Sequence, residues 1–192
     1  MKITILTGSN RPGRFNIQPA QWITNIAKKN TSIEVNLVDL QELNLPFLDE
    51  AMPASLNKYA HEHTKAWSKI IGESDGFVFV TPEYNHSYSA ILKNAIDYLA
   101  LEWNYKPVAF VSYGALVAGA RAVEHLRAVA GELKMFDIRE QVLFPNYWEQ
   151  LDEKGQYKFT DRNNDSAEAM LNVLVFWAKQ MKKGREELSK VK

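Results

Sequence analysis

The sequence contains no cysteine. Disulfide bonds, thiolate nucleophiles and cysteine-ligated metal sites are therefore excluded, although this absence does not identify a compartment. The 23 basic and 23 acidic side chains give a formal net charge of +0, which argues against a general nucleic-acid-binding protein and against a strongly charged electron carrier. No apolar run reaches membrane-spanning length, and the opening MKITILTGSN is typical of a first strand rather than a signal peptide. We expect a cytoplasmic protein with no nucleic-acid or membrane partner.

Along the chain, strand patterns alternate with helix patterns. Short apolar runs occur at residues 2–7, 33–38, 76–80, 108–111 and 135–144, and segments with helical periodicity lie between them. This alternation predicts one α/β domain over residues 1–192, with a doubly wound, five-stranded parallel sheet of order 2-1-3-4-5 and helices on both faces.

Two helices are predicted from their apolar spacing. Apolar residues three and four apart predict a helix from about Leu56 to Gly72, with His63 on its apolar side as a core or interface residue rather than a ligand. The last helix is expected to start at Asp165, with Glu168 completing a capping box, and to fray after Gly184.

The turn after the first strand, residues 8–16, has the composition of a phosphate-binding loop. A strand, a glycine- and hydroxyl-rich turn and a helix start would direct free amides at an anion. Arg11 and Arg14 add positive charge, and Ser9 and Asn16 add hydrogen-bond donors.

Three alternative interpretations of this turn remain open. A P-loop would need Lys and a hydroxyl where Arg14 and Phe15 stand, and the dinucleotide fingerprint GxGxxG is absent, although Asp39 occupies the place of a ribose-binding acid. The third alternative is a solvated turn whose arginines contact no ligand.

Two further loops should meet the first one. In the predicted strand order, residues 8–16, 82–87 and 112–119 converge at the carboxyl edge of the sheet, where open α/β sheets bind ligands. Pro82 stiffens the second loop, and Asn85 tolerates unusual backbone angles. One loop suits a phosphate and the other two suit a flat ring, so a mononucleotide with a planar head fits the combination.

Three separated motifs resemble the NADPH-dependent FMN reductase family of flavodoxin-like flavin, quinone, azo-dye and chromate reductases. They are GSNRPGR in the first loop, PEYN with Ser87 and LKNAID around the second, and Lys106-Pro107, SYG, Arg121-Ala122 and Leu126-Arg127 around the third. The resemblance covers residues 1 to about 145. The chain has Ser89, Ala90, Ala115 and Ala118 where the family usually has proline or glycine.

The resemblance implies FMN as cofactor and NADPH or NADH as co-substrate. It places Ser9, Arg11, Arg14, Asn16 and Ile17 on the FMN phosphate. Along the isoalloxazine it places the other two loops, through Pro82, Glu83, Tyr84, Asn85, Ser112, Tyr113 and Gly114.

The implied reaction is a ping-pong transfer of hydride from NAD(P)H to FMN and on to a small-molecule acceptor such as a quinone, flavin or azo compound. The flavin carries the chemistry, so no catalytic side chain and no metal are expected, and His86 is interpreted as an exposed loop histidine. The family also implies a homodimer or homotetramer. The alternative function is a flavin-binding electron carrier or redox-sensing interaction protein without turnover of its own.

Overall fold

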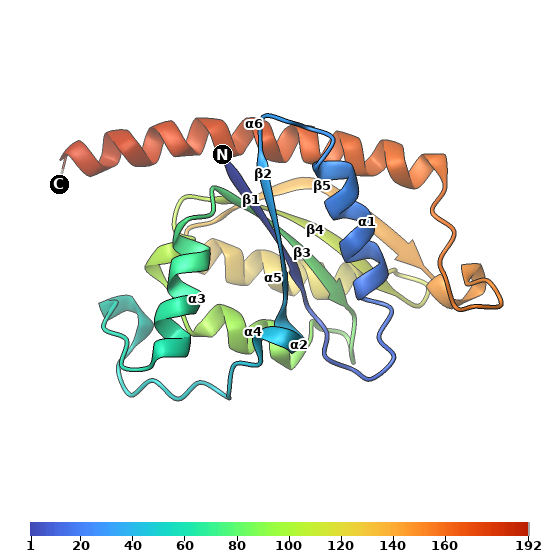
Figure 1. Ribbon diagram of the computed structural model, residues 1–192, viewed down its shortest axis with the longest axis horizontal. Coiled ribbons are helices and arrows are strands. Elements are labelled where there is room, and N and C mark those ends of the chain that lie inside the picture. The colour runs from blue at the N-terminus through green and yellow to red at the C-terminus, as the bar shows by residue number, and fades with distance from the viewer. Residues whose placement is uncertain (192) are drawn as a thin grey trace.

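The computed structural model describes residues 1–191 and contains a five-stranded parallel sheet of order β2-β1-β3-β4-β5 (Figure 1). The predicted strand order is therefore confirmed. The strands are β1 (Lys2–Thr7), β2 (Glu34–Asp39), β3 (Gly76–Pro82), β4 (Pro107–Gly114) and β5 (Phe136–Pro145).

Helices cover both faces of this sheet, as expected (Figure 1). One face carries α1 (Ile17–Ala27) and α6 (Asp161–Val191), and the other carries α3 (Glu62–Gly72), α4 (Ala90–Asp97) and α5 (Ala120–Glu132). The short helix α2 (Leu40–Leu43) follows β2, and single 3-10 turns occupy Ala54–Leu56, Leu101–Trp103 and Tyr147–Gln150.

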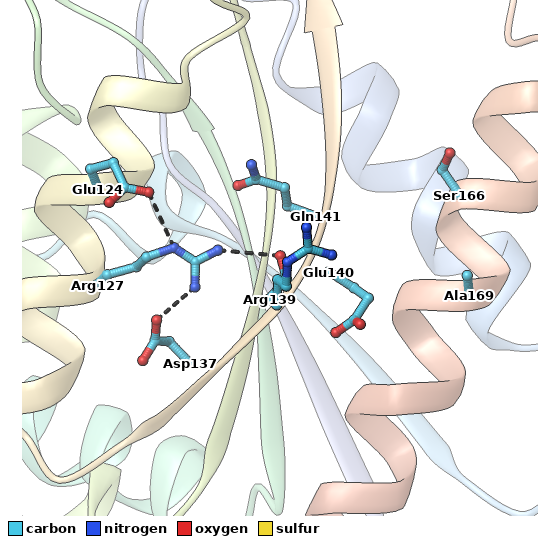
Figure 2. A pocket seen from close by; sticks show the side chains of 8 residues that line it. All are labelled: Glu124, Arg127, Asp137, Arg139, Glu140, Gln141, Ser166 and Ala169. Carbon is cyan, nitrogen blue, oxygen red and sulfur yellow. Dashed lines mark hydrogen bonds and ion pairs between the residues drawn. The ribbon is translucent and has the colours of Figure 1, made fainter.

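The outer edge of β5 is open and charged. A hollow of about 730 Å³ lies here between α5, β5 and α6. Figure 2 shows Arg127 on its α5 side, beside Glu124 and Asp137. Arg127 donates to Asp137 at 2.6 Å and to the Ile138 carbonyl at 2.9 Å, and Glu124 lies 3.5 Å away. The guanidinium is thus already satisfied. Because this hollow lies along an edge strand rather than at the carboxyl ends of the strands, it is not where this fold binds a cofactor.

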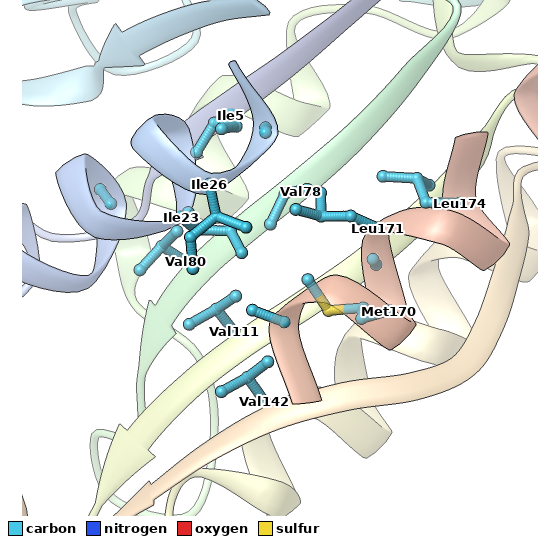
Figure 3. Close-up of a cluster of buried hydrophobic side chains, with 14 of the residues drawn as sticks. Ile5, Ile23, Ile26, Val78, Val80, Val111, Val142, Met170, Leu171 and Leu174 are labelled. Carbon is cyan, nitrogen blue, oxygen red and sulfur yellow. The ribbon is translucent and has the colours of Figure 1, made fainter. Parts of the chain in front are cut away.

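Apolar burial on both faces holds the sheet in place. Every residue of β3 is buried, as expected for a central parallel strand. On the α1 and α6 face, Val78 and Val80 contribute to the cluster shown in Figure 3, together with Met170 and Leu174 of α6. On the other face, the tryptophans Trp67 and Trp103 are fully buried. The two clusters fix the positions at which the strands end, and hence where the loops lie.

The helix predicted from Leu56 begins later, at Glu62. Asn57 has a left-handed backbone (φ 51°) that ends a 3-10 turn. The Glu50 carboxylate then accepts the N–H groups of Ala60 and His61 at 2.8 and 3.1 Å, so the chain stays extended up to the helix. His63 is half-buried and hydrogen-bonded to Asp49 at 3.0 Å, which satisfies its ring nitrogen without a ligand.

Both predicted ends of the last helix are wrong. The helix begins at Asp161, because Thr160 and Asn163 form a reciprocal cap: the Thr160 N–H donates to Asn163 Oδ1 at 2.9 Å, and the Asn163 N–H to Thr160 Oγ1 at 3.3 Å. It continues through Gly184 to Val191.

The buried carboxylate of Asp75 explains why this helix continues. Asp75 is 5% exposed and accepts the backbone N–H of Lys2 at 3.0 Å. It also binds Lys182 at 3.1 Å and Arg185 at 2.8 Å, and Arg185 donates to the Tyr105 carbonyl at 2.9 Å. The polar residues of the tail thus include two that form ion pairs at the start of β3, which the sequence pattern did not indicate.

Between residues 1 and 191, no helix is both long enough and apolar enough to cross a membrane.

Gly184 lies inside α6, and a Cβ added there would meet no atom within 4 Å. Alanine is more favourable than glycine in a helix interior, so Gly184→Ala is expected to raise the free energy of unfolding by about 0.5–1 kcal/mol. Urea denaturation followed by circular dichroism measures this change. A lower stability in the variant would contradict a continuous helix.

Lys106 is a buried cation at the start of β4. Its ammonium donates to the carbonyls of Ile71 and Gly72, at 2.7 and 3.0 Å, at the end of α3. Burial, aided by the positive charge of Arg185, lowers the pKa of Lys106 to about 8.

The lowered pKa of Lys106 predicts a pH-dependent stability. The unfolded chain binds this proton more tightly than the folded protein, so stability should rise with pH between about 8 and 10.5. The variant Lys106→Met should lack this rise, which amounts to about 1 kcal/mol per pH unit. Thermal melts of both proteins from pH 7 to 10 test the difference, and parallel curves would contradict it.

Candidate functional site

Hydrogen bonds join the three loops at the carboxyl ends of β1, β3 and β4. The Gly8 N–H donates to the Val80 carbonyl at 2.7 Å, and the Ser9 and Tyr84 hydroxyls lie 2.8 Å apart. The Glu83 N–H donates to the Tyr113 carbonyl at 3.1 Å. The structure therefore brings the first loop (residues 8–16), the second loop (82–87) and the third loop (112–119) to one place.

The first loop is organised around a buried ion pair. Arg14 binds both carboxylate oxygens of Asp39, and it donates to the Ser9 carbonyl at 2.5 Å. Asp39 also accepts from Thr7 at 2.8 Å and from the Gln41 N–H at 3.0 Å. Burial by itself raises the pKa of Asp39, but these hydrogen bonds and the Arg14 charge outweigh it and hold the pKa below its ordinary value. Arg14 thus stabilises the conformation of the first loop through contacts with Ser9 and Asp39.

Arg11 is placed differently. Its side chain is exposed, and within residues 1–191 no carboxylate lies within ion-pair distance of it. Since the charge of Arg14 is compensated by Asp39, Arg11 is the guanidinium of this loop that stays available to an anion. Ile17 opens α1. The Gln18 N–H donates to the Phe15 carbonyl at 2.9 Å and Pro19 has no N–H, so the Ile17 N–H is the one that this end of the helix can offer to a ligand.

The second loop ends in a tight two-residue turn. Tyr84 and Ser87 exchange backbone hydrogen bonds of 2.8 and 3.1 Å across Asn85 and His86. Both turn residues have positive φ, 47° and 75°, as in the turns that most often close hairpins. Asn85 was expected to tolerate such angles, but the positive φ of His86 was not predicted.

The third loop folds back onto the end of β4. The Ser112 hydroxyl donates to the Ala118 carbonyl at 2.8 Å, and Ala118 and Gly119 have φ of 55° and 84°. The positive φ shows that position 118, an alanine in this chain, has a backbone conformation that glycine adopts more readily. Tyr113 is buried; burial, together with the nearby Tyr84, raises its pKa, so its hydroxyl remains a donor at neutral pH.

An ion pair between a buried carboxylate and a partly exposed arginine connects the second loop to the helix after the third. The Glu83 side chain is 7% exposed, and Glu83 Oε1 accepts from Arg121 Nε at 2.6 Å. Arg121 lies at the second position of α5. This ion pair thus links the second loop to α5, the helix that follows the third loop.

Several atoms at the loop junction fit a bound cofactor. Asn16 Oδ1 and Glu83 Oε2 are buried without a hydrogen-bond partner, and such atoms need a donor from water or a ligand. A Cβ on Gly8 would lie 2.9 Å from the Val80 carbonyl, so only glycine allows this close approach of the first and second loops. Beside the junction lies a hollow of about 550 Å³, lined in part by Asn10, Tyr84 and the start of α4.

Ser89, one of the positions where the sequence departs from the family motif that it resembles, has a structural role of its own. Its hydroxyl donates to the Gly8 carbonyl at 2.5 Å, and it accepts the Leu92 N–H at 3.4 Å as the N-cap of α4. The first loop is thereby tied to α4 as well as to the second loop.

The excursion after β5 supports the first loop, which the sequence did not reveal. Phe15 stacks on Tyr147 with ring centroids 4.2 Å apart, and it meets the edge of Tyr113 at 5.1 Å. Gln18 of α1 exchanges hydrogen bonds with Gly155 and Tyr157 at 2.8 and 2.7 Å. Aromatic residues scattered along a polar segment were the only sequence signal of this packing.

Comparison with known proteins identifies the family. Residues 1–149 match the family described as NADPH-dependent FMN reductase. The chain belongs to this family.

Individual relatives of this FMN reductase agree. It is 45% identical over 136 residues to an NAD(P)H-dependent FMN reductase of Schizosaccharomyces pombe, covering 70% of this chain and 68% of the relative. It is 34% identical over 154 residues to an NAD(P)H:quinone oxidoreductase of Solanum tuberosum, covering 78% and 77%. The flavoenzyme NAD(P)H:(acceptor) oxidoreductase FerB from Paracoccus denitrificans has the same fold, with a TM-score of 0.69 over 95% of this chain and 97% of FerB, at 22% identity.

The FMN reductase is thus an oxidoreductase that uses FMN as cofactor and NAD(P)H as co-substrate. The family match ends at residue 149, so α6 and most of the excursion that supports the first loop lie outside it.

Proposed function

We propose that the three joined loops hold FMN and that the protein passes electrons from NAD(P)H through it to a quinone, azo or flavin-type acceptor, in ping-pong order. The observation that carries this proposal is the junction itself: a phosphate-suited loop and two ring-suited loops are hydrogen-bonded through Ser9, Tyr84 and Glu83. The names of relatives, among them the quinone oxidoreductase of Solanum tuberosum, support the acceptor class.

Each loop has a defined part in this proposal. Arg11, the Ile17 N–H and the Ser9 hydroxyl would bind the phosphate. Asn16, whose Nδ2 donates to the Val80 carbonyl at 2.9 Å, and Arg14 keep the loop in shape. Pro82–Asn85 and Ser112–Gly114 would line the ring, with backbone amides that stabilise negative charge on it. When bound, FMN supplies the redox chemistry, by accepting hydride and giving up two electrons.

A homodimer is also part of the proposal. Phe47, Leu48 and Met52 are exposed by 84%, 47% and 48%. Asn94 of α4 holds the backbone of this segment, by hydrogen bonds to Pro46 and Leu48 of 2.7 and 3.0 Å. An apolar patch of this kind beside the site is suited to a second copy of the chain. Sedimentation velocity measures the oligomeric state, and a monomer at micromolar concentration would exclude the dimer. We place the protein in the cytoplasm, where its co-substrate is available.

Anaerobic mixing with NADPH tests the function. The purified, FMN-loaded protein should lose its yellow colour within seconds and regain it on addition of a quinone. A flavin that stays oxidised would favour the electron carrier, and a protein that takes up no FMN would refute both functions. A panel of acceptors with steady-state rates then ranks quinone, azo compound and free flavin.

A further inference from the structure

Two histidines from different elements meet at the rim of the loop junction. His86 forms the tip of the second loop, and His125 lies on the face of α5 that turns toward this loop. Their ring centroids are 6.0 Å apart, and both side chains are exposed. His125 Nδ1 lies 2.9 Å from the Ser87 hydroxyl, which fixes the His125 ring beside the turn.

His86 occupies a position that is unfavourable for its residue type. At φ 75°, the second residue of the turn is strained for any side chain with a Cβ, whereas glycine adopts this angle freely. The strain costs about 1 kcal/mol. The imidazole makes no hydrogen bond within residues 1–191 that would offset it. A strained backbone conformation that no local contact compensates is often found at functional sites, and here it lies at the tip of a loop.

Reduction of a quinone, one of the proposed acceptors, calls for an acid. A quinone becomes a hydroquinone by taking up two electrons and two protons, and a hydride brings both electrons with only one proton. The second carbonyl oxygen therefore needs a proton from an acid. Histidine is the side chain that most readily gives and regains a proton near neutral pH.

We propose that His86 is the general acid that protonates the quinone oxygen, with His125, anchored on Ser87, as the positioning residue that confines its ring. This inference rests on the proposed FMN site. The hydride would leave the reduced flavin, breaking its bond there, and form a new bond to one quinone oxygen. An electron pair of the quinone π system would then shift to the opposite oxygen, which would take the proton from the His86 imidazolium. The imidazole then recovers a proton from solvent, so atoms and charge balance.

The charged groups around the pair are already matched. Glu83 of the second loop is paired with Arg121 of α5, and Glu124 of α5 lies beside Arg127, 3.5 Å away. Within residues 1–191, the carboxylates of Glu83 and Glu124 are thus each matched by an arginine, and Glu132 lies at the far end of α5. The pair can exchange protons with solvent and acceptor.

Reoxidation of the prereduced, FMN-loaded enzyme tests the proposal by stopped flow. His86→Asn keeps a residue that tolerates positive φ and removes the imidazole. We expect it to slow reoxidation by a quinone about 10- to 100-fold, since water replaces the acid only in part. Reoxidation by ferricyanide, which takes one electron and no proton, should change less than about twofold. Added imidazole should restore part of the quinone rate.

Two further measurements separate a chemical role from a structural one. The FMN dissociation constant, followed by flavin fluorescence, and the rate of reduction by NADPH should be unchanged in His86→Asn. His125→Gln should slow quinone reoxidation less than His86→Asn does. Equal losses with quinone and ferricyanide, or no loss with either, would overturn the proposal. A wild-type protein that binds FMN poorly or resists reduction by NADPH would instead refute the proposed function.

Discussion

Removal of the Arg14 side chain, in the variant Arg14→Ala, is expected to lower the free energy of unfolding of the FMN-free protein by about 2–4 kcal/mol. The side chains of Arg14 and Asp39 are 12% and 9% exposed, so the variant leaves a carboxylate buried without its cation. Thr7 and Gln41 still donate to Asp39, which keeps the loss below that of an isolated buried charge. Urea denaturation of the apoprotein measures the change.

Arg11→Ala is the matched comparison, since it removes the same side chain from the same loop. Arg11 is exposed, so the stability of the apoprotein should change by less than about 0.5 kcal/mol. The affinity for FMN should fall about 10- to 100-fold, by loss of a charged hydrogen bond to phosphate, and this loss should shrink at high salt. Fluorescence titrations with FMN and with riboflavin, which lacks the phosphate, measure the two affinities. Urea denaturation of the apoprotein measures the stability.

Acid titration adds an independent check on Arg14. The pKa of Asp39 is lowered in the folded protein, so its contribution is fully present above the ordinary value of 3.8 and is lost as pH falls through the folded value. The acid transition of Arg14→Ala should therefore be less steep below pH 4. Equal stability of the two arginine variants would show that the Arg14–Asp39 pair does not brace the loop.

Gly119→Ala should be the most damaging single methyl added near the site. Gly119 has φ 84°, and a Cβ there would lie 2.9 Å from Ser112 Cβ and 3.0 Å from the backbone of Tyr113. Since these neighbours belong to the end of β4 and cannot give way, we expect a loss of about 2–4 kcal/mol in stability. The displaced third loop should also weaken FMN binding about tenfold or more. Thermal melts and FMN titration measure both effects.

Gly131→Ala, inside the helix that follows Gly119, is the control. A Cβ at Gly131 meets nothing within 4 Å, so this variant should gain about 0.5–1 kcal/mol from helix propensity and leave FMN binding unchanged. If Gly119→Ala instead retained full stability and affinity, the third loop would have to differ from the conformation described.

The strands and their order were predictable because the central strands β3 and β4 have apolar runs and strand patterns alternate with helix patterns along the sequence. The helix ends were less predictable because they depend on contacts distant in sequence. Glu50 delays the start of α3 by binding Ala60 and His61, and Asp75 holds the end of α6 through Arg185. Periodicity within one segment carries no information about such partners.

The three loops of the site were predictable from motif and strand order, but their internal pairing was not. The sequence shows two arginines in the first loop and cannot tell that Arg14 binds Asp39 while Arg11 stays exposed. Asp39 was considered only as a ribose-binding acid. The positive φ of His86 also depends on the hydrogen bonds between Tyr84 and Ser87, which only the folded turn reveals.

The long helix α6 has a mechanical consequence. It begins after a segment that contacts Gln18, the residue after the start of α1. Near its other end it forms ion pairs with Asp75, at the amino end of β3. A pulling force can be applied at the C-terminus by an optical trap or a fused domain. It would first act on the two ion pairs with Asp75 and would then be transmitted along α6 to the segment that contacts the first loop. Stretching the protein from this end should thus release FMN before the sheet comes apart.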